Sequence, residues 1–468
     1  MGSGKTSAAI NFINSHPEEK FIVLTPFLSE IDRFVSACPK HNFQVPACEN
    51  VNCKSVSFNY YLEHGKNIVA THQLLFVQNA TIVEKIRNYN LIIDEAFNCA
   101  IKEIDKLWPF EKKMIFENCF NLEEDGTLVW KQNKNYNGDL LKKLKNLSDQ
   151  GRLKGFHTGN NYGIFEVFPS EILLAFKNVF VLTFLFEYQY FFYYLKSENI
   201  ETKPLYVMED SGNYYFTDIE PEQKPINIDK LIHIHMGKVT KAFPNGKINS
   251  IGDNPFALSK NWYKTRGDLM KLQKDLDNYL TNIVKTPARK VMWTTYKEFK
   301  TKLCGKRHRR NYVSCNAKAT NDFSGRTTLA YLVNLFMSPS IVMYFNSFGI
   351  NVSQNGFTLS ETVQWIWRSA IRNGKEIDLY IPSSRTRNLV VAFIDYVCGK
   401  TDKIVGIDAA LNLSSIEIDD ESNIYEDETI DIDAGFVADF GDYIPFKPEI
   451  IPWETDTFEV IPPSTLAS

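Results

Sequence analysis

Short apolar runs without polar interruptions recur along the chain and alternate with segments of helical periodicity. Phe21–Leu24, Ile68–Ala70 and Leu91–Ile93 are such runs, and each is followed by a threonine or an aspartate. Continuous runs of this length are typical of strands buried on both faces, as in parallel sheets covered by helices. The pattern therefore predicts an α/β fold with polar side chains where the strands end.

The same pattern predicts how the chain is divided. Residues 1–187 are expected to form a first domain, within which 101–170 are interpreted as an insertion because they lack strand–helix alternation. The run Asn178–Phe184 returns to the strand pattern, with Thr183 near its end. Residues 188–260 contain strand-like pieces joined by polar turns and are interpreted as an irregular linker.

A second α/β domain is expected at 261–400, before a tail at 401–468. Its pattern predicts a helix over Tyr263–Val284 and a strand over Lys290–Thr295. The apolar run Ile341–Phe345 predicts another buried strand.

A further helix is predicted to carry Gln364, Arg368 and Arg372, which are spaced four residues apart. This spacing places the three polar side chains on one helical face. A surface helix can hold arginines merely for solubility. If the face points at a nucleotide held by the first domain, however, Arg368 and Arg372 would stabilise charge during phosphoryl transfer.

The chain opens on Met1-Gly2-Ser3-Gly4-Lys5-Thr6, residue types that form phosphate-binding loops. In such loops glycines let backbone N–H groups surround a polyphosphate, a lysine neutralises it, and a hydroxyl binds Mg²⁺. The match is partial, because the full pattern has an earlier glycine and a strand that leads into the loop. A disordered Gly/Ser-rich start is the alternative. We predict that upstream codons encode an apolar strand of about five residues and the missing glycine or an alanine.

Two adjacent carboxylates, Asp94 and Glu95, follow the run Leu91–Ile93. Open α/β sheets bind ligands at the carboxyl ends of their strands. With a phosphate-binding loop nearby, Asp94 would hold Mg²⁺ and Glu95 would polarise the attacking water. An ordinary helix N-cap is the alternative interpretation of Asp94.

Charge is distributed unevenly although the net charge is only −4. Residues 401–468 carry 17 acidic residues against two lysines, or −15, whereas residues 1–400 carry +11. A basic body with an acidic tail is typical of proteins that handle polyanions. The densest basic cluster, with Lys306, Arg307, Arg309 and Arg310, is a candidate nucleic-acid contact.

Composition narrows the class of protein further. An apolar content of 44% is globular, and no apolar run reaches the roughly 20 residues of a membrane span. No secretory signal is present, so we expect a cytoplasmic, intracellular protein without a membrane partner. The eight cysteines are interpreted as reduced structural thiols, because the group around Cys38, His41 and Cys48 lacks zinc-knuckle spacing.

Taken in order, these residues resemble the motifs of superfamily 2 helicases of the DEAD/DEAH-like kind common in phage and other mobile-element genomes. The resemblance covers most of residues 1–390. Gly2–Thr6 resembles motif I, Thr25-Pro26 resembles motif Ia, and Thr71-His72 resembles the T-H pair that follows it. Asp94–Phe97 resembles motif II, and Thr183 lies at the place of motif III. Asn346–Asn351 resembles motif V, and Gln364–Arg372 resembles motif VI.

The resemblance implies two RecA-like P-loop domains in tandem that close over ATP and Mg²⁺ and act on nucleic acid. The first of these domains would lack its initial strand. By this resemblance the ATP ligands are Gly2, Ser3, Gly4, Lys5, Thr6 and Asp94, of which Thr6 and Asp94 hold Mg²⁺. The catalytic residues are Glu95, Gln364, Arg368 and Arg372, and Thr25, Pro26, Thr71 and His72 face nucleic acid.

Three positions depart from the family pattern. Phe97 stands where motif II ends in aspartate or histidine, which puts the usual contact with motif III in doubt. Trp367 replaces the motif VI glycine, and the second arginine comes one place late. Arg368 therefore matches the arginine finger of the motif better than Arg372 does. Asn351 replaces the more frequent aspartate of motif V.

We therefore expect an ATP-dependent helicase or translocase that acts on nucleic acid, DNA rather than RNA, in phage or mobile-element replication or recombination. One alternative is a terminase-like packaging ATPase, with the acidic clusters at 419–421 and 426–428 as nuclease carboxylates. Another is a nucleic-acid-binding protein without turnover, because the loop lacks the strand that anchors it.

Overall fold

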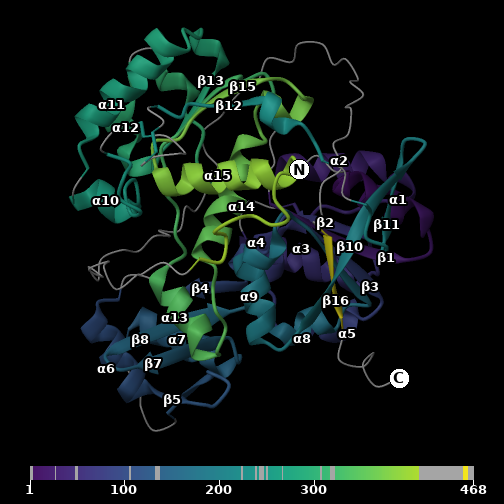
Figure 1. Ribbon diagram of the computed structural model, residues 1–468. Helices are drawn as coiled ribbons and strands as arrows, with labels where there is room; N and C mark the ends of the chain where they lie inside the picture. Colours follow the sequence, from purple (N-terminus) through teal and green to yellow (C-terminus); the bar gives the residue numbers. More distant parts are fainter. Residues whose placement is uncertain are drawn as a thin grey trace.

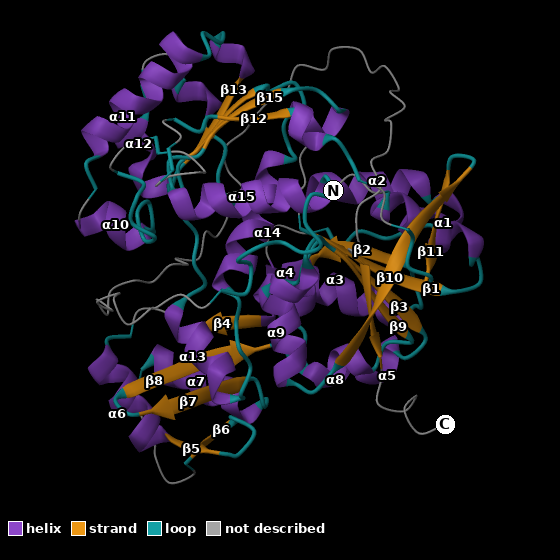
Figure 2. Cartoon of the chain, viewed as in Figure 1, coloured by secondary structure: helices purple, strands orange, loops and turns teal. Residues whose placement is uncertain are grey.

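The computed structural model describes residues 4–26, 28–47, 51–104, 107–131, 138–222, 225–237, 240–241, 247–248, 251–265, 267–305, 308–316, 322–409 and 457–461. Two open sheets are each covered by helices, and a smaller antiparallel unit lies beside the first (Figure 1, Figure 2). The protein is thus a mixed α/β fold with parallel sheets, as its apolar pattern predicts.

The first sheet is built on four parallel strands in the order β2-β1-β3-β9. Alternate residues of β1 face opposite layers: Phe21 and Val23 pack with helix α1 (Lys5–Ser15), while Ile22 and Leu24 join the core on the other face. Burial on both faces explains the unbroken apolar runs. The strands are β1 (Lys20–Thr25), β2 (Ile68–Thr71), β3 (Tyr89–Asp94) and β9 (Asn178–Leu182).

Three further strands extend this sheet beyond β9. They are β16 (Thr457–Ile461), β10 (Glu201–Asp210) and β11 (Asn213–Thr217), and each pairs antiparallel with its neighbour. Their origin differs from the sequence expectation, because β10 and β11 come from the stretch interpreted as a linker. The strand β16 comes from the expected tail, whose residues 410–456 lie outside the described part.

Helices cover both faces of the first sheet (Figure 1). The loops after β1 and β2 lead directly into α2 and α4, so the amino ends of these two helices lie at the carboxyl ends of the strands. The helices are α1 (Lys5–Ser15), α2 (Leu28–Ala37), α3 (Val51–Glu63), α4 (His72–Phe76), α5 (Val83–Ile86), α8 (Ser170–Leu174) and α9 (Tyr190–Ser197).

The expected insertion folds as a unit with its own apolar core. It holds a three-stranded antiparallel sheet in the order β4-β8-β7 and a β5-β6 hairpin. Its elements are β4 (Ile101–Glu103), α6 (Pro109–Cys119), β5 (Phe120–Leu122), β6 (Leu128–Trp130), α7 (Asp139–Asp149), β7 (Leu153–Thr158) and β8 (Asn161–Val167).

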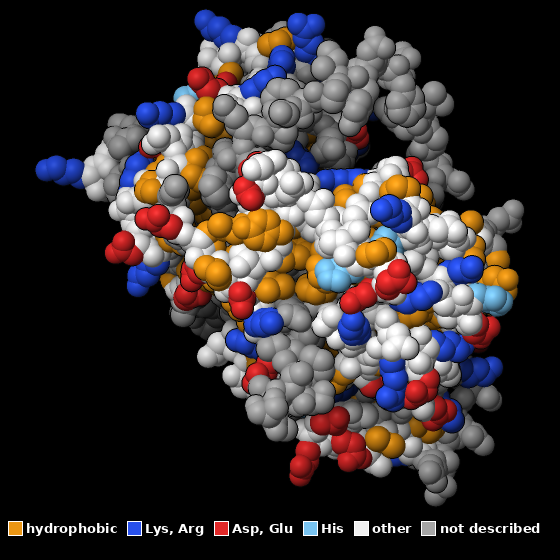
Figure 3. Space-filling view, turned by 90° about the vertical axis from the view of Figure 1, so that its right-hand side faces the viewer, with side chains coloured by type: hydrophobic (Ala, Val, Ile, Leu, Met, Phe, Trp, Pro, Cys, Tyr) orange, Lys and Arg blue, Asp and Glu red, His pale blue; other side chains and the backbone are white. Residues whose placement is uncertain are grey.

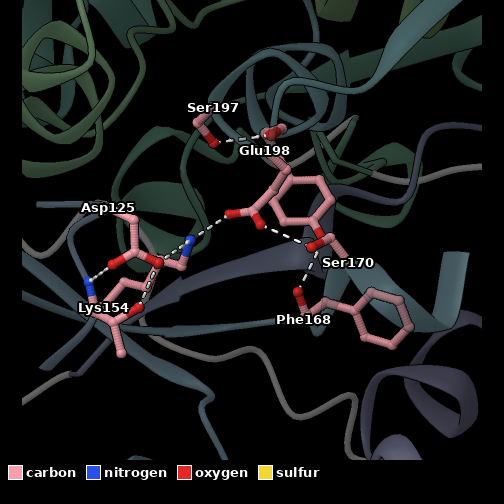
Figure 4. A network of polar contacts seen from close by, with 8 residues as sticks. Asp125, Lys154, Phe168, Ser170, Ser197 and Glu198 are labelled. Atoms are coloured by element: carbon pink, nitrogen blue, oxygen red, sulfur yellow. Dashed lines mark hydrogen bonds and ion pairs between the residues drawn. The ribbon is translucent and has the colours of Figure 1, made fainter. Parts of the chain in front are cut away.

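A polar network joins this unit to the first domain (Figure 4). Lys154 Nζ lies 2.7 Å from Glu198 Oε1, and Ser170 Oγ donates to the other carboxylate oxygen at 2.8 Å. Asp125 approaches the same lysine at 4.0 Å. Because both charges are largely buried and satisfied, the network fixes the insertion on α9.

The second sheet has four parallel strands in the order β12-β15-β14-β13. Helices again lie on both faces (Figure 2). The elements are β12 (Ile232–Ile234), α10 (Lys260–Thr265), α11 (Leu269–Asn278), β13 (Val291–Thr294), α12 (Lys300–Leu303), β14 (Thr328–Tyr331), α13 (Pro339–Ser347), α14 (Gln354–Ile366), β15 (Ile377–Tyr380) and α15 (Ser384–Val397).

Three sequence predictions for this half are wrong. The single helix expected over Tyr263–Val284 is divided into α10 and α11, because Asp268 caps a new helix with its side chain. Ile341–Phe345 lies within helix α13, because Pro339 begins a helix at its first position and a short apolar run does not distinguish strand from buried helix. The helix expected to carry both arginines ends at Ile366. There Ser369 Oγ donates to the Ile366 carbonyl at 2.7 Å and begins a separate 3₁₀ turn.

The cysteines agree with expectation except at one position: Cys53 is disulfide-bonded, whereas reduced thiols are carried by Cys38, Cys99, Cys119, Cys304, Cys315 and Cys398. Within the described ranges, no three His, Cys, Asp or Glu side chains are grouped as metal ligands. None of the helices in those ranges is long and apolar enough to cross a membrane.

Candidate functional site

The polar residues that follow the parallel strands of the first sheet meet at one edge. Thr25 pairs with Thr71 across β1 and β2, and Asp94 pairs with Leu182, next to Thr183. Since all four strands run in the same direction, their carboxyl ends form a single line. This is the edge at which open α/β sheets bind ligands.

The opening loop reaches the same edge. Gly4 adopts the left-handed conformation, with φ +79°, and caps α1. Two residues later, Thr6 Oγ1 donates to Asp94 Oδ1 at 3.4 Å. The structure therefore brings Gly4, Lys5 and Thr6 to the first carboxylate, while Gly2 and Ser3 lie outside the described residues.

Asp94 is buried and electrostatically strained. Burial is the main cause that raises its pKa to about 7, and the neighbouring carboxylate of Glu95 raises it further. The positive charges of Arg33 and Lys5 oppose this shift. An aspartate in this environment favours a proton or a bound cation over a free negative charge.

Glu95 has an unusual backbone. Its φ is +65°, a conformation that L-residues other than glycine seldom adopt and that costs about 1–3 kcal/mol. Its backbone N–H donates to the Leu182 carbonyl at 2.9 Å, and Thr183 Oγ1 donates to Glu95 Oε2 at 3.4 Å. The end of β9 thus holds the Glu95 carboxylate in one orientation.

His72 supports the same turn instead of lying on an open surface. Its Nε2 donates to the Asp94 carbonyl at 2.9 Å, and its ring packs edge-on against Phe97. Phe97 is completely buried and also contacts Phe168 and Phe191. Where related motifs have aspartate or histidine, this chain therefore has an aromatic packing residue.

The second domain contributes an arginine to the site. Arg368 is 6% exposed, and its Nη1 has no hydrogen-bond partner among the described residues. Burial lowers the pKa of its guanidinium, and the opposing charge of Glu95 is the largest influence that raises it. Arg368 therefore faces the carboxylate edge with an N–H group available.

Arg372 belongs to the same electrostatic neighbourhood. Burial and Arg33 lower the pKa of Arg372, while Glu30, Glu95 and Asp94 raise it. Glu30 and Arg33 lie on α2, and sequence reasoning missed both. The only available signal was their position immediately after Thr25-Pro26, at the start of a helix that leaves the ligand edge.

Gln364 takes part in a buried relay between the two domains. Its Nε2 donates to Ser360 Oγ at 3.2 Å, and Gln189 Nε2 donates to the same oxygen. Ser360 Oγ in turn donates to the Phe184 carbonyl at 3.2 Å. Asn98, four residues beyond Asp94, donates to Gln189 Oε1 at 3.4 Å. The relay connects motif II and the end of β9 to α14.

The residues expected to contact nucleic acid are not gathered in one place. Thr25 is fully buried at the end of β1, so its side chain does not reach the surface, and Pro26 and Thr71 are half-buried. Arg309 and Arg310 are exposed on a 3₁₀ turn of the second domain. This turn is held beside the amino end of β13 by a bond from Asn311 to the Ala288 carbonyl.

Lys306 and Arg307, the other members of the basic cluster, lie outside the described residues. A cavity of about 370 Å³ opens near the amino ends of β13 and β14. It is lined by Arg289, Lys290, Asp322, Gly325 and Arg326.

Fold and site define a mixed α/β protein with parallel sheets, and the comparisons agree with this class. Residues 227–394 match the family described as the YonV C-terminal Rossmann-like domain. The chain is 36% identical over 405 residues to the SPbeta prophage-derived uncharacterized protein YonV of Bacillus subtilis (strain 168), which covers 84% of this chain and 97% of that protein. The chain therefore belongs to the YonV family.

A solved chain named XPD in its apo form is similar over 85% of this chain and 93% of that chain, with 9% identity and a TM-score of 0.39.

Proposed function

We propose that the protein is an ATP-hydrolysing helicase or translocase, built on two tandem RecA-like domains, that acts on nucleic acid. The observation that carries the proposal is the meeting of three distant segments. Thr6 and Asp94 are joined by a 3.4 Å hydrogen bond, and the partly unsatisfied Arg368 is influenced most by Glu95 among the nearby charges. Structural ion pairs are usually fully satisfied, whereas this group is not.

ATP would lie between Gly4–Thr6 and the arginines of the second domain, with Gly2 and Ser3 completing its ligands. The residues fit Mg²⁺, because a hydroxyl and a carboxylate supply the oxygen ligands that this cation prefers. Mg²⁺ would neutralise phosphate charge when bound, and Thr6 and Asp94 would hold it. A cation here also favours the ionised form of Asp94, whose pKa burial raises.

The other side chains divide the catalytic work. Glu95, oriented by Thr183, would accept a hydrogen bond from the attacking water. Arg368 and Arg372 would stabilise the charge that develops on the transferred phosphoryl group. Gln364 would couple the nucleotide site to the first domain, because its amide is hydrogen-bonded to Ser360 in the relay.

Nucleic acid, DNA rather than RNA, is the proposed partner, and residues 1–400 carry the positive charge that such binding requires. Arg309 and Arg310 are exposed candidates, with Lys306 and Arg307 beside them in sequence. The prophage origin of the YonV relative supports a role in phage or mobile-element replication or recombination.

ATP hydrolysis with and without single-stranded or forked DNA tests the proposal. We expect DNA to stimulate hydrolysis, and Lys5→Ala or Glu95→Gln to abolish it. Glu84→Gln, at an exposed glutamate paired with Arg87, is the matched control. Hydrolysis that does not respond to nucleic acid contradicts the helicase assignment, and absence of ATP binding favours a binding protein without turnover.

A terminase-like packaging ATPase is the second candidate. The acidic clusters 419–421 and 426–428 that would supply its nuclease carboxylates lie outside the described residues. Metal-dependent nicking of plasmid DNA would favour this candidate over the helicase.

A further inference from the structure

The strand β16 lies in the interior of the first sheet although it comes from the far end of the chain (Figure 1). On one side Thr457–Val460 pair with Leu182–Val179 of β9, and on the other Thr457–Ile461 pair with Leu205–Glu201 of β10. Both partners therefore use β16 to satisfy their backbone groups. Without it, β9 and β10 would each present an unpaired edge.

The hairpin β10-β11 links β16 to the opening loop. Asn11 of α1 donates its side-chain N–H to the Tyr214 carbonyl at 2.9 Å. The Tyr214 ring lies directly over Gly4, where a Cβ atom would be only 2.2 Å from the ring. Phe216 stacks on Phe180 of β9 at 5.9 Å. The hairpin thus covers the residue that begins the phosphate-binding helix.

The sequence of residues 457–463 is typical of a short strand that adds to a sheet formed by other parts of the chain. Thr457-Phe458-Glu459-Val460-Ile461 is rich in β-branched and aromatic residues, which favour strands. Pro462 and Pro463 follow at once and cannot continue a strand within a sheet. The segment is therefore a short strand with a defined end, preceded by a long acidic stretch.

The face that carries α1 and the hairpin is not uniformly apolar. Hydrophobic side chains gather near its middle, and Lys, Arg, Asp and Glu are interspersed over its lower part (Figure 3). The hairpin is joined to the sheet by the backbone ladder between β10 and β16 and by the Tyr214 and Phe216 contacts.

We propose that the edges of β9 and β10 form a strand-binding groove, and that residues 457–461 are its ligand within the same chain. Addition of this strand holds Tyr214 on Gly4 and so shapes the proposed nucleotide site. The link to nucleotide rests on the proposed function, whereas the groove itself does not. Strand addition of this kind gains affinity from main-chain hydrogen bonds.

Engineered disulfides test the occupant and its register in the full-length chain. Val460→Cys with Val179→Cys should cross-link under mild oxidation, because these residues are direct partners. Val460→Cys with Val181→Cys, two residues out of register, is the control and should not. An intramolecular product supports the proposal. No cross-link, equal cross-linking of both pairs, or a product that joins two chains overturns it.

Hydrogen exchange tests what the strand does. Glu459→Pro removes a backbone N–H from the centre of β16, whereas Glu459→Gln keeps the backbone intact. We expect the proline variant alone to speed exchange in Asn178–Leu182 and Glu201–Leu205 by about tenfold or more. A synthetic peptide of residues 455–463, added in trans, should restore protection. Unchanged exchange in the proline variant, or no response to the peptide, overturns the groove.

Nucleotide binding is then measured on the same two variants. Glu459→Pro should weaken ATP affinity by about tenfold, and the peptide should recover it. If the proline variant loses strand protection but binds ATP like Glu459→Gln, the link to the nucleotide site is wrong. If the unmodified protein binds no ATP, the proposed function fails, while cross-linking and exchange still decide the groove.

Discussion

Two buried arginines of the second domain differ in how their hydrogen-bonding groups are used. Arg385, 8% exposed, donates to Asn355, Asn334, Leu335, Gln354 and Thr358 and lies 4.2 Å from the Phe336 ring centroid. Arg368 is just as buried, at 6%, but its Nη1 has no partner within the described ranges. The first arrangement is complete and holds the domain together, whereas the second can still take a ligand.

The carboxylates of the first domain show the same contrast. Glu198 is satisfied on both oxygens by Lys154 and Ser170 (Figure 4). Asp94 is more deeply buried, and within the described part of the chain its Oδ1 accepts a long bond, 3.4 Å, from Thr6 Oγ1. The Glu198 network, which joins the insertion to the first domain, is thus complete, as is the Arg385 network within the second domain, whereas among the described residues the groups of Asp94 and Arg368 are incompletely bonded.

The largest expected effect comes from removing each of the two arginines in turn. Arg368→Ala should lower ATP turnover by about 10³-fold and leave the free energy of unfolding unchanged or raised, because a buried charge with an unused donor is removed. Steady-state hydrolysis and urea unfolding measure the two quantities. Arg87→Ala, at an exposed arginine, is the control. A large loss of stability without loss of turnover would make Arg368 a structural residue.

Arg385→Ala should give the opposite result. Its removal takes one donor from each of five buried acceptors, and the free energy of unfolding should fall by about 3–5 kcal/mol. Turnover per folded molecule should stay within about threefold of the unmodified protein. The urea midpoint and active-site titration provide the measurements. A folded variant that is stable but inactive would contradict the assignment.

The carboxylate contrast predicts a pH dependence. Because burial raises the pKa of Asp94 to about 7, the folded chain keeps a proton there that the unfolded chain releases near pH 4. Without Mg²⁺ the free energy of unfolding should therefore fall as pH rises from about 4 to about 7. Urea midpoints across this range measure the slope, and Asp94→Asn should flatten it. An equal slope in that variant would assign the effect to another group.

The smallest expected effect concerns the buried relay of Gln189, Ser360 and Gln364. Ser360→Ala removes the oxygen shared by Gln189, Gln364 and the Phe184 carbonyl, and turnover should fall by about tenfold while ATP affinity changes little. Ser347→Ala, which removes a hydroxyl bonded only within α13 at the Tyr344 carbonyl, is the matched control. Equal effects of both substitutions would show that the relay has no special role.

Much of the first sheet follows from the sequence, because its strands are buried on both faces. The runs around Phe21, Ile68 and Leu91 are strands, and Asp94 and Thr183 lie at their carboxyl ends as predicted. The secondary structure of Ile341–Phe345 could not be predicted from the sequence, since five apolar residues fit either a buried strand or a helix. The opening loop lies beside Asp94, but its chemistry remains a prediction.

Other features depend on contacts between distant segments. Nothing in the sequence around Glu30 or Arg33 indicates that α2 turns them towards Arg372. The end of α14 at Ile366 depends on the Ser369 hydroxyl, a local competition that periodicity does not reveal. The strand β16 could not be predicted, because its five residues are too few to give a strand pattern within the acidic segment 401–468.

The position of β16 has a consequence for biosynthesis. Leu182 and Thr457 are partners although more than two hundred residues separate them in sequence. Contacts of such long range form slowly, because the loop between them must close first. The first sheet therefore cannot be completed on the ribosome until residue 461 has been made. Throughout translation β9 and β10 have exposed edges, which is when the protein is most prone to aggregate or to bind a chaperone.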